Sequence, residues 1–139
     1  MRYLIAALAL AGVAVASLAL QVHYSTGTEP CSINTRWDCG IVNHSSYAVI
    51  DHVPVALIGI LGYLAMAGLA FFRRRGFLIV ASVLGMAFAL HLTFIEKNVL
   101  QIWCLYCVIS QGIIALITLL SIVWLVIAMR TKSRARMTA

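Results

Sequence analysis

Long apolar stretches separated by short polar segments dominate this chain. Four stretches without Asp, Glu, Lys or Arg cover residues 3–22, 53–72, 77–95 and 101–129. Each is long enough to cross a bilayer, which takes about 20 apolar residues in a helix. Because backbone polar groups that face lipid must be paired within their own segment, each stretch is predicted to be helical. The pattern therefore predicts one all-α integral membrane domain over residues 1–139, a bundle of four transmembrane helices.

The segment 23–52 is the longest polar part of the chain, yet its second half is not composed like a flexible linker. Apolar positions from Ile41 to Ile50, with Tyr47 among them, alternate there with Asn, His and Ser. This predicts a short helix or cap that lies over the mouth of the bundle. The links at 73–76 and 96–99 are short, so consecutive helices are predicted to be antiparallel neighbours. We expect Glu96, Lys97 and Asn98 to form a tight turn outside the membrane.

Composition supports the membrane assignment and excludes a soluble globule. The chain is 63% hydrophobic and 10% charged, and its mean hydropathy is +1.02. Such a chain has too little polar surface for a soluble domain of this size. The net charge of +6 does not predict nucleic-acid binding, because the basic residues are split among the span ends and no aromatic residues alternate with them.

The basic residues instead predict the orientation of the helices. Lys and Arg near span ends favour the cytoplasmic side. Two basic residues, Arg36 and Lys97, fall on one side with all four acids, and the other eight fall opposite: Arg2, Arg73, Arg74, Arg75, Arg130, Lys132, Arg134 and Arg136. Both termini are therefore predicted to be cytoplasmic. Residues 1–22 are long for a cleaved signal peptide and lack a polar cleavage region, so we expect them to stay as the first span.

The pair Cys104 and Cys107 opens the last apolar stretch. Cysteines three residues apart share one face of a helix, and the positive end of the helix dipole favours a thiolate there. At a rise of about 1.5 Å per residue, Cys107 lies roughly 4.5 Å deeper in the membrane than Cys104. We therefore expect Cys107 to meet a lipid-soluble electron carrier and Cys104 to meet protein thiols.

The other two cysteines, Cys31 and Cys39, lie in the outer segment with seven residues between them. A compartment outside the cytosol tolerates disulfides, so the pair could be a structural staple. A second pair at the membrane rim favours a relay, in which one thiolate after another attacks the next disulfide. A zinc site built from all four cysteines is the remaining hypothesis. The loop pair lacks the usual gap of two to four residues between zinc ligands, so we predict no metal.

These motifs together resemble the vitamin K epoxide reductase family in its bacterial single-domain form. The resemblance rests on Cys31-x7-Cys39, on Ser45 six residues later, on the stretch from Pro54 to Tyr63, and on Cys104-x2-Cys107 opening the last helix. It covers essentially the whole chain. It implies a four-helix bundle around a quinone, capped by the loop that carries the first cysteine pair.

The resemblance also implies a function and roles for individual residues. A reduced periplasmic thioredoxin-fold protein, similar to DsbA and acting in trans, would pass electrons to the shuttle pair Cys31 and Cys39. Cys104 would be the exchange partner of the loop, and Cys107 the thiol beside the quinone, either ubiquinone or menaquinone. The family pattern places Ser45, Tyr63 and Gln111 in the quinone pocket. The enzyme would lie in the bacterial inner membrane with its active site at the periplasmic face.

Some features separate this chain from relatives and leave other functions open. Gln111 stands where the animal enzymes carry a tyrosine, so epoxide reduction and coumarin sensitivity are not transferred. DsbB-type oxidases also use four helices, but there the CxxC pair comes first in the chain. A quinone or epoxide reductase driven by a dithiol partner is one alternative, and a membrane scaffold or metal-binding protein with static cysteines is another.

Two further polar positions, His91 and Asn43, are candidates for function or modification. His91 is an ionisable residue within the third span, and such residues are functional candidates. We expect it to face the bundle and bond to a neighbour, with proton delivery to the quinone as the alternative. Asn43-His44-Ser45 matches a glycosylation sequon, but we expect Asn43 to be buried under the cap and therefore not to be glycosylated.

Overall fold

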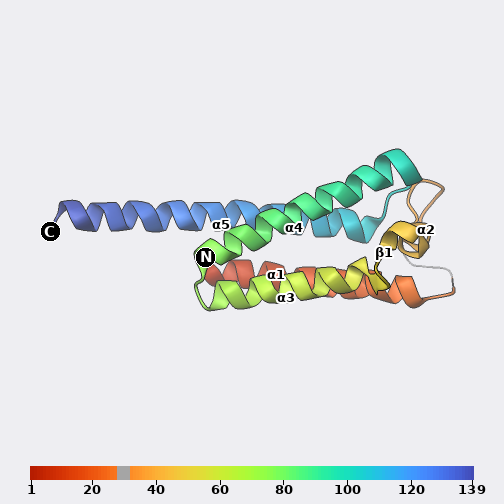
Figure 1. Cartoon of the computed structure of the whole chain (residues 1–139), viewed down its shortest axis with the longest axis horizontal. Helices are drawn as coiled ribbons and strands as arrows, with labels where there is room; N and C mark the ends of the chain where they lie inside the picture. Colours follow the sequence, from red (N-terminus) through yellow and green to blue (C-terminus); the bar gives the residue numbers. More distant parts are fainter. Residues whose placement is uncertain (28–31) are drawn as a thin grey trace.

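The computed structural model describes residues 1–27 and 32–139. Long helices run side by side in an elongated bundle (Figure 1). Both termini lie at one end, here called the inner end, and α2 lies at the opposite, outer end. The long helices are α1 (Arg2–Tyr24), α3 (Val55–Phe71), α4 (Arg75–Ile95) and α5 (Leu105–Met137).

In the described part of the chain, three helical segments are long and apolar enough to cross a membrane. They are α1, α4 with its extension to Leu100, and α5, while α3 is a shorter apolar helix of 17 residues. The structure therefore holds three to four apolar helices able to span a membrane. Two predicted boundaries were wrong: α3 begins at Val55 because the two preceding residues pair in a hairpin, and α5 begins at Leu105 because residues 101–104 are not helical.

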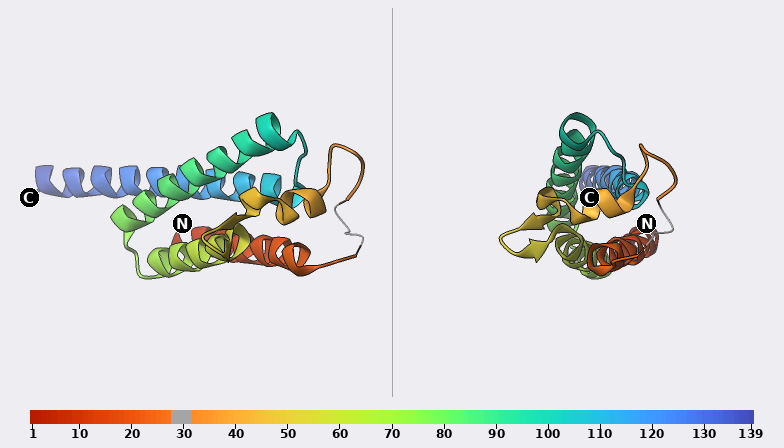
Figure 2. Two further views of the ribbon diagram at one scale, coloured as in Figure 1. Left: turned by 45° about the vertical axis from the view of Figure 1, so that its right-hand side comes forward. Right: turned by 90° about the vertical axis from the view of Figure 1, so that its right-hand side faces the viewer.

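The outer segment folds as a compact cap. It contains α2 (Cys39–His44), the short 3-10 helix η1 (Ser46–Ala48) and a hairpin of β1 (Val49–Ile50) and β2 (Val53–Pro54). Asp38 begins α2, and its carboxylate accepts a hydrogen bond from the backbone N–H of Ile41 at 3.2 Å. Figure 2 shows α2 lying across the outer end of the bundle. The predicted short helix is confirmed, whereas the hairpin was not foreseen.

The link between α4 and α5 is not the tight turn that the sequence predicted. A π-helix, η2 (Glu96–Leu100), continues directly from α4, and Gln101 then adopts a left-handed conformation with φ 56°. The wider turn of a π-helix accommodates an extra residue and is common at functional sites. In this structure it leaves Glu96 buried, with 3% of its surface exposed.

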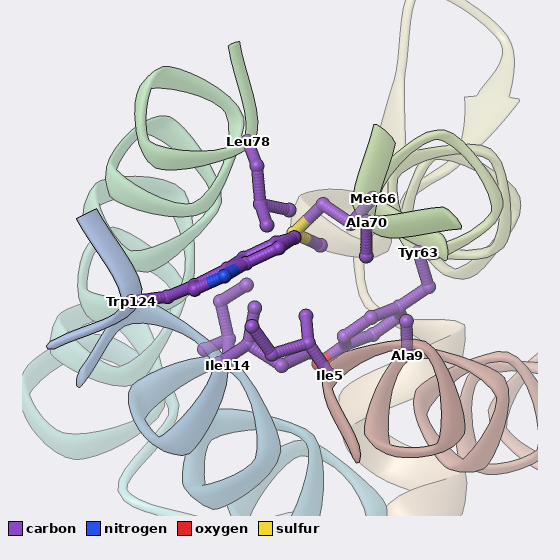
Figure 3. Packing of buried hydrophobic residues seen from close by; sticks show 9 residues of the cluster. Ile5, Ala9, Tyr63, Met66, Ala70, Leu78, Ile114 and Trp124 are labelled. Carbon is purple, nitrogen blue, oxygen red and sulfur yellow. The ribbon is translucent and has the colours of Figure 1, made fainter. Parts of the chain in front are cut away.

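Large side chains fill the inner half of the bundle. Leu78 of α4, Met66 of α3 and Trp124 of α5 point toward one another (Figure 3). The contacts of α1 are mainly with α3 and α5, and α4 packs chiefly on α5. The outward faces stay apolar, as with Leu10 and Leu119, which are 56% and 61% exposed. An apolar surface of this kind suits lipid contact.

Candidate redox site at the outer end of the bundle

A short backbone bridge joins the outer loop to the residues that precede the CxxC pair. The N–H of Asp38 donates to the carbonyl of Trp103 at 3.0 Å, and the N–H of Trp103 donates to the carbonyl of Arg36 at 2.7 Å. The rings of Trp37 and Trp103 also stack, with centroids 6.2 Å apart. The bridge aligns the chain leading to Cys39 with the chain leading to Cys104.

Cys39 and Cys104 are packed in one buried cluster as a result. Both side chains are fully buried, and Val22 and Val42 complete the cluster. Cys39 is disulfide-bonded, while Cys104 and Cys107 are free thiols. Cys31 lies outside the described residues, so its predicted role stays a prediction.

Cys104 and Cys107 lie at the start of α5, as the spacing predicted. Cys104 is the N-cap residue, and its carbonyl accepts the N–H of Val108 at 3.1 Å. A hydrogen bond from the Cys107 side chain lowers the pKa of the Cys104 thiol, although burial opposes this effect. Asn43 acts in the same direction as Cys107, and the Glu96 charge opposes it. The lowered pKa of Cys104 has the direction that the helix dipole predicts, and its largest cause is the side-chain hydrogen bond from Cys107.

Asn43 is a component of the site that the sequence analysis missed. It is 7% exposed, and its Nδ2 donates to the carbonyl of Cys39 at 2.9 Å and to Sγ of Cys104 at 3.6 Å. Its own carbonyl lies 2.6 Å from Nδ1 of His23. The burial expected for the sequon is confirmed. The available signal was its position four residues after Cys39, which places both on one face of α2.

Glu96 is the second component that was missed. Its Oε2 accepts the backbone N–H of Cys104 at 3.2 Å, and its carboxyl hydrogen-bonds the side chain of Cys107. From the sequence, Glu96 is predicted to lie in a tight turn outside the membrane. A lone carboxylate next to an apolar span and eight residues before Cys104 was the signal that could have revealed it.

A cavity of about 400 Å³ lies between the cap and the long helices. Its wall is mostly apolar, and Cys107 is part of it. α3 and α4 diverge toward the outer end (Figure 1), and both contribute to the wall. A few polar residues interrupt the apolar lining: Asn43, Ser45, Tyr63, Thr93, Glu96 and Ser110.

The three predicted pocket residues occupy different places relative to this cavity. Ser45 lines it, and its hydroxyl donates to the carbonyl of Val42 at 2.7 Å. Tyr63 lines it from α3, and its hydroxyl lies 2.8 Å from both the carbonyl and the hydroxyl of Ser110. Gln111 lies behind the wall, where its Oε1 accepts a hydrogen bond from the hydroxyl of Thr93. The structure thus brings Ser45 and Tyr63 to the cavity, and Gln111 to one of its lining residues.

His91 does not belong to this group of residues. It is exposed on the outer surface of α4. The expectation that it faces the bundle was wrong, because the face of α4 that carries Thr93, Leu92 and Ala89 lines the cavity instead.

An apolar helical bundle with a free dithiol between a disulfide-bonded cap and an internal apolar cavity is typical of membrane thiol oxidoreductases. The family model of the vitamin K epoxide reductase family matches residues 3–122. The chain belongs to this family. Its members are oxidoreductases that couple disulfide chemistry to a quinone and work with thiol–disulfide partners. A comparison with curated protein sequences gave no match.

Proposed function

We propose that this protein oxidises a reduced periplasmic thioredoxin-fold protein and passes the electrons to a membrane quinone. Electrons would enter at Cys31 and Cys39, move to Cys104 and Cys107, and leave to the quinone. One observation carries the proposal. The free dithiol has one sulfur in the buried cluster with disulfide-bonded Cys39 and the other sulfur on the wall of an apolar cavity.

Each step of this path balances as an exchange of two electrons. The partner dithiol reduces the loop disulfide and is itself oxidised to a disulfide. The loop dithiol then reduces a Cys104–Cys107 disulfide through a mixed disulfide, with a thiolate attacking sulfur each time. Finally the Cys104–Cys107 dithiol closes to a disulfide, and a quinone takes two electrons and two protons to become a quinol. The described state, with Cys39 oxidised and the CxxC pair reduced, precedes this last step.

The cavity suits a quinone in its size, in its composition and in its position. A largely apolar space of about 400 Å³ falls within the range of small-molecule sites, which carry a few polar groups that orient the ligand. Two of its lining residues, Gly62 and Leu84, are exposed on the bundle surface, and Leu84 is 66% exposed. They lie on α3 and α4, so an isoprenoid tail could leave toward lipid between these helices.

We assign the polar contacts of the quinone to Ser45 and Tyr63, with Gln111 in a supporting role. The Ser45 hydroxyl is engaged with Val42 and can rotate to donate to a quinone oxygen. Tyr63 is oriented by Ser110. Gln111 would hold Thr93 in the wall through their hydrogen bond.

The proposed placement in the membrane follows the charge distribution. Four spans, with α3 as the second, would put both termini in the cytoplasm and the cap at the periplasmic face of the inner membrane. The two termini lie at the same end of the bundle, opposite α2 (Figure 1). Basic residues cluster at that end, four of them between Arg130 and Arg136, which supports this orientation.

The test is anaerobic quinone reduction by the purified protein in detergent with a reduced DsbA-like donor, for the wild type and each Cys→Ala variant. We expect all four variants to lose turnover while remaining folded. Turnover that does not need Cys31 and Cys39 would make the loop pair a structural staple. Faster reduction of a quinone epoxide than of the quinone by the same dithiol donor would instead favour an epoxide reductase, and the absence of any quinone reduction would favour static cysteines.

A further inference from the structure

Glu96 is a buried acid that the electron path above does not use. Only 3% of its surface is exposed, and it belongs to the wall of the apolar cavity. A carboxyl in such surroundings is costly unless it is bonded or exchanges a proton. Its two bonding partners are the backbone N–H of Cys104 and the side chain of Cys107. Both partners belong to the redox pair itself.

The single proton of the Cys107 thiol has two possible acceptors, the Cys104 sulfur and the Glu96 carboxyl. The thiol is hydrogen-bonded to both of them. A thiol has a single proton, so it can donate to only one of them at a time. Closing a disulfide requires both thiol protons to leave. Glu96 is the carboxyl that the described residues place against the Cys107 thiol.

We propose that Glu96 accepts the thiol proton of Cys107 and delivers it into the cavity, where the quinone is reduced. This inference rests on the proposed function for the identity of the final acceptor. As the S–S bond forms, two electrons leave the two sulfurs for the quinone. The Cys107 proton passes to the Glu96 carboxylate and then to one quinone oxygen, while the Cys104 proton supplies the second. Glu96 ends each turnover ionised, as it began.

The π-helix η2 encloses the Glu96 side chain. Glu96 is the first residue of η2, and its backbone carbonyl accepts the N–H of Ile102 at 3.2 Å. This bond folds the link back over Glu96, so the carboxyl is enclosed between the CxxC pair and the cavity. Besides Cys107, the other titratable residues of the cavity wall are three tyrosines: Tyr47, Tyr63 and Tyr106. Lys97, the next residue on η2, is exposed and does not line the cavity.

The first test is steady-state reduction of a short-chain quinone with dithiothreitol as donor, which reduces the CxxC pair without a protein partner. Glu96→Gln should lower kcat by about 10²-fold, within the usual range for a lost proton-transfer group, with KM little changed. The wild-type rate should rise with pH as Glu96 ionises, and this limb should vanish in Glu96→Gln. Glu96→Asp should keep the limb at a reduced rate.

Asp51→Asn is the matched control, because Asp51 is an exposed acid of the cap with φ 48°, a conformation that Asn also adopts. It should behave like the wild type. If Glu96→Gln keeps both the wild-type rate and the pH limb, the inference is wrong.

Infrared difference spectra of the wild type test the proton step without a quinone and without a variant that must fold. With no quinone to take it, the Cys107 proton should stay on Glu96 when the disulfide closes, so the dithiol and disulfide states should differ in a carboxyl C=O band that shifts in heavy water and moves in Glu96→Asp. The lack of any such band would overturn the inference. Wild type that shows the band but reduces no quinone would keep the proton acceptor and overturn the proposed function instead.

Discussion

The inner and outer halves of the bundle are built from the same helices but are packed in opposite ways. In the inner half, large side chains meet at the axis, among them Leu78, Met66 and Trp124. In the outer half, Ala16, Gly59 and Gly85 face a cavity of about 400 Å³. Three residues of the buried cluster also line the cavity and form the boundary: Tyr63, Met66 and Ile114. One set of helices thus supplies a rigid base and an open site.

The comparison shows that the cavity depends on residue size and not on polarity. Mean composition is apolar along all four helices, so hydropathy alone does not separate the halves. A Cβ added at Gly85 would lie 3.2 Å from Cδ1 of Ile114, and one at Gly59 would lie 3.6 Å from Cβ of Ala16. Small residues therefore maintain both the space and the close approach of its walls.

The largest effect on the comparison should come from removing the inner packing. Trp124→Ala should lower the free energy of unfolding by about 3 kcal/mol, the low end for a large-to-small change at a buried aromatic residue. Unfolding by SDS titration from mixed micelles measures this loss. Phe94→Ala is the control, because Phe94 is 62% exposed on α4 and should change stability by less than about 0.5 kcal/mol. Equal losses would mean that the inner half is not the rigid base.

Filling the outer cavity should block quinone chemistry and leave the fold intact. Gly62 lines the cavity at its exposed side, and a Cβ there meets nothing within 4 Å, so Gly62→Leu should obstruct the cavity where it opens between α3 and α4. We expect quinone turnover to fall about 10- to 100-fold, because the added side chain takes the place of part of the quinone; this corresponds to roughly 1.4–2.7 kcal/mol. Gly68→Leu tests the same change toward the inner end of α3, where open space also surrounds the Cβ. If both variants lose turnover equally, the cavity is not the quinone site.

The boundary between the halves should be sensitive to a single methyl group. A Cβ at Gly12 would lie 2.5 Å from the ring of Tyr63, and the hydroxyl of that ring is tied to Ser110. Gly12→Ala should therefore cost about 1–2 kcal/mol of stability. Adding Tyr63→Leu should recover part of this loss in a double-mutant cycle. Strictly additive effects would show that the two residues do not press on each other.

The smallest predicted effect concerns the thiol chemistry at the outer end. Asn43 donates to Sγ of Cys104 and helps to lower its pKa. Asn43→Leu removes this donor, so the pKa should rise and the thiolate should form at higher pH. Exchange at neutral pH should slow about 2- to 10-fold, as expected for one hydrogen bond. Thiolate ultraviolet absorbance against pH, with Cys104→Ala as the blank, measures the shift. An unchanged or lower midpoint would contradict this assignment.

The sequence predicted the regular parts of this structure and the cysteine pair, because these depend on local pattern. Most helix ends fell within a few residues of the apolar stretches, although Val53 and Pro54 join the hairpin and residues 101–104 precede α5. The large departure is the end of α5, which continues to Met137, well past the apolar stretch that ends at residue 129. The family could be predicted because its motifs are ordered along the chain.

The two site residues that sequence reasoning missed, Glu96 and Asn43, depend on contacts between segments far apart in the chain or on the unforeseen π-helix. Glu96 was expected to be a solvated turn residue, because no residue near it in the sequence predicts a π-helix. From the sequence Asn43 stands out only as part of a sequon. Its hydrogen bond to Cys104 joins residues 61 positions apart, which no local pattern predicts. The burial of each is set by the cap folding onto the link before α5. That contact rests on the Trp37–Trp103 bridge, which no periodicity reveals.

The Trp37–Trp103 bridge also has a kinetic consequence. Because it ties the loop to the chain ahead of Cys104, the two cysteine pairs of the proposed relay would be tethered reactants that do not meet by diffusion. Tethering of this kind gives an effective concentration of about a millimolar or more. Exchange within the molecule should then be first order and independent of protein concentration. Dilution would slow only the delivery of electrons by the soluble donor. Thiol–disulfide exchange between the two pairs of one molecule would still reach equilibrium at low enzyme concentration.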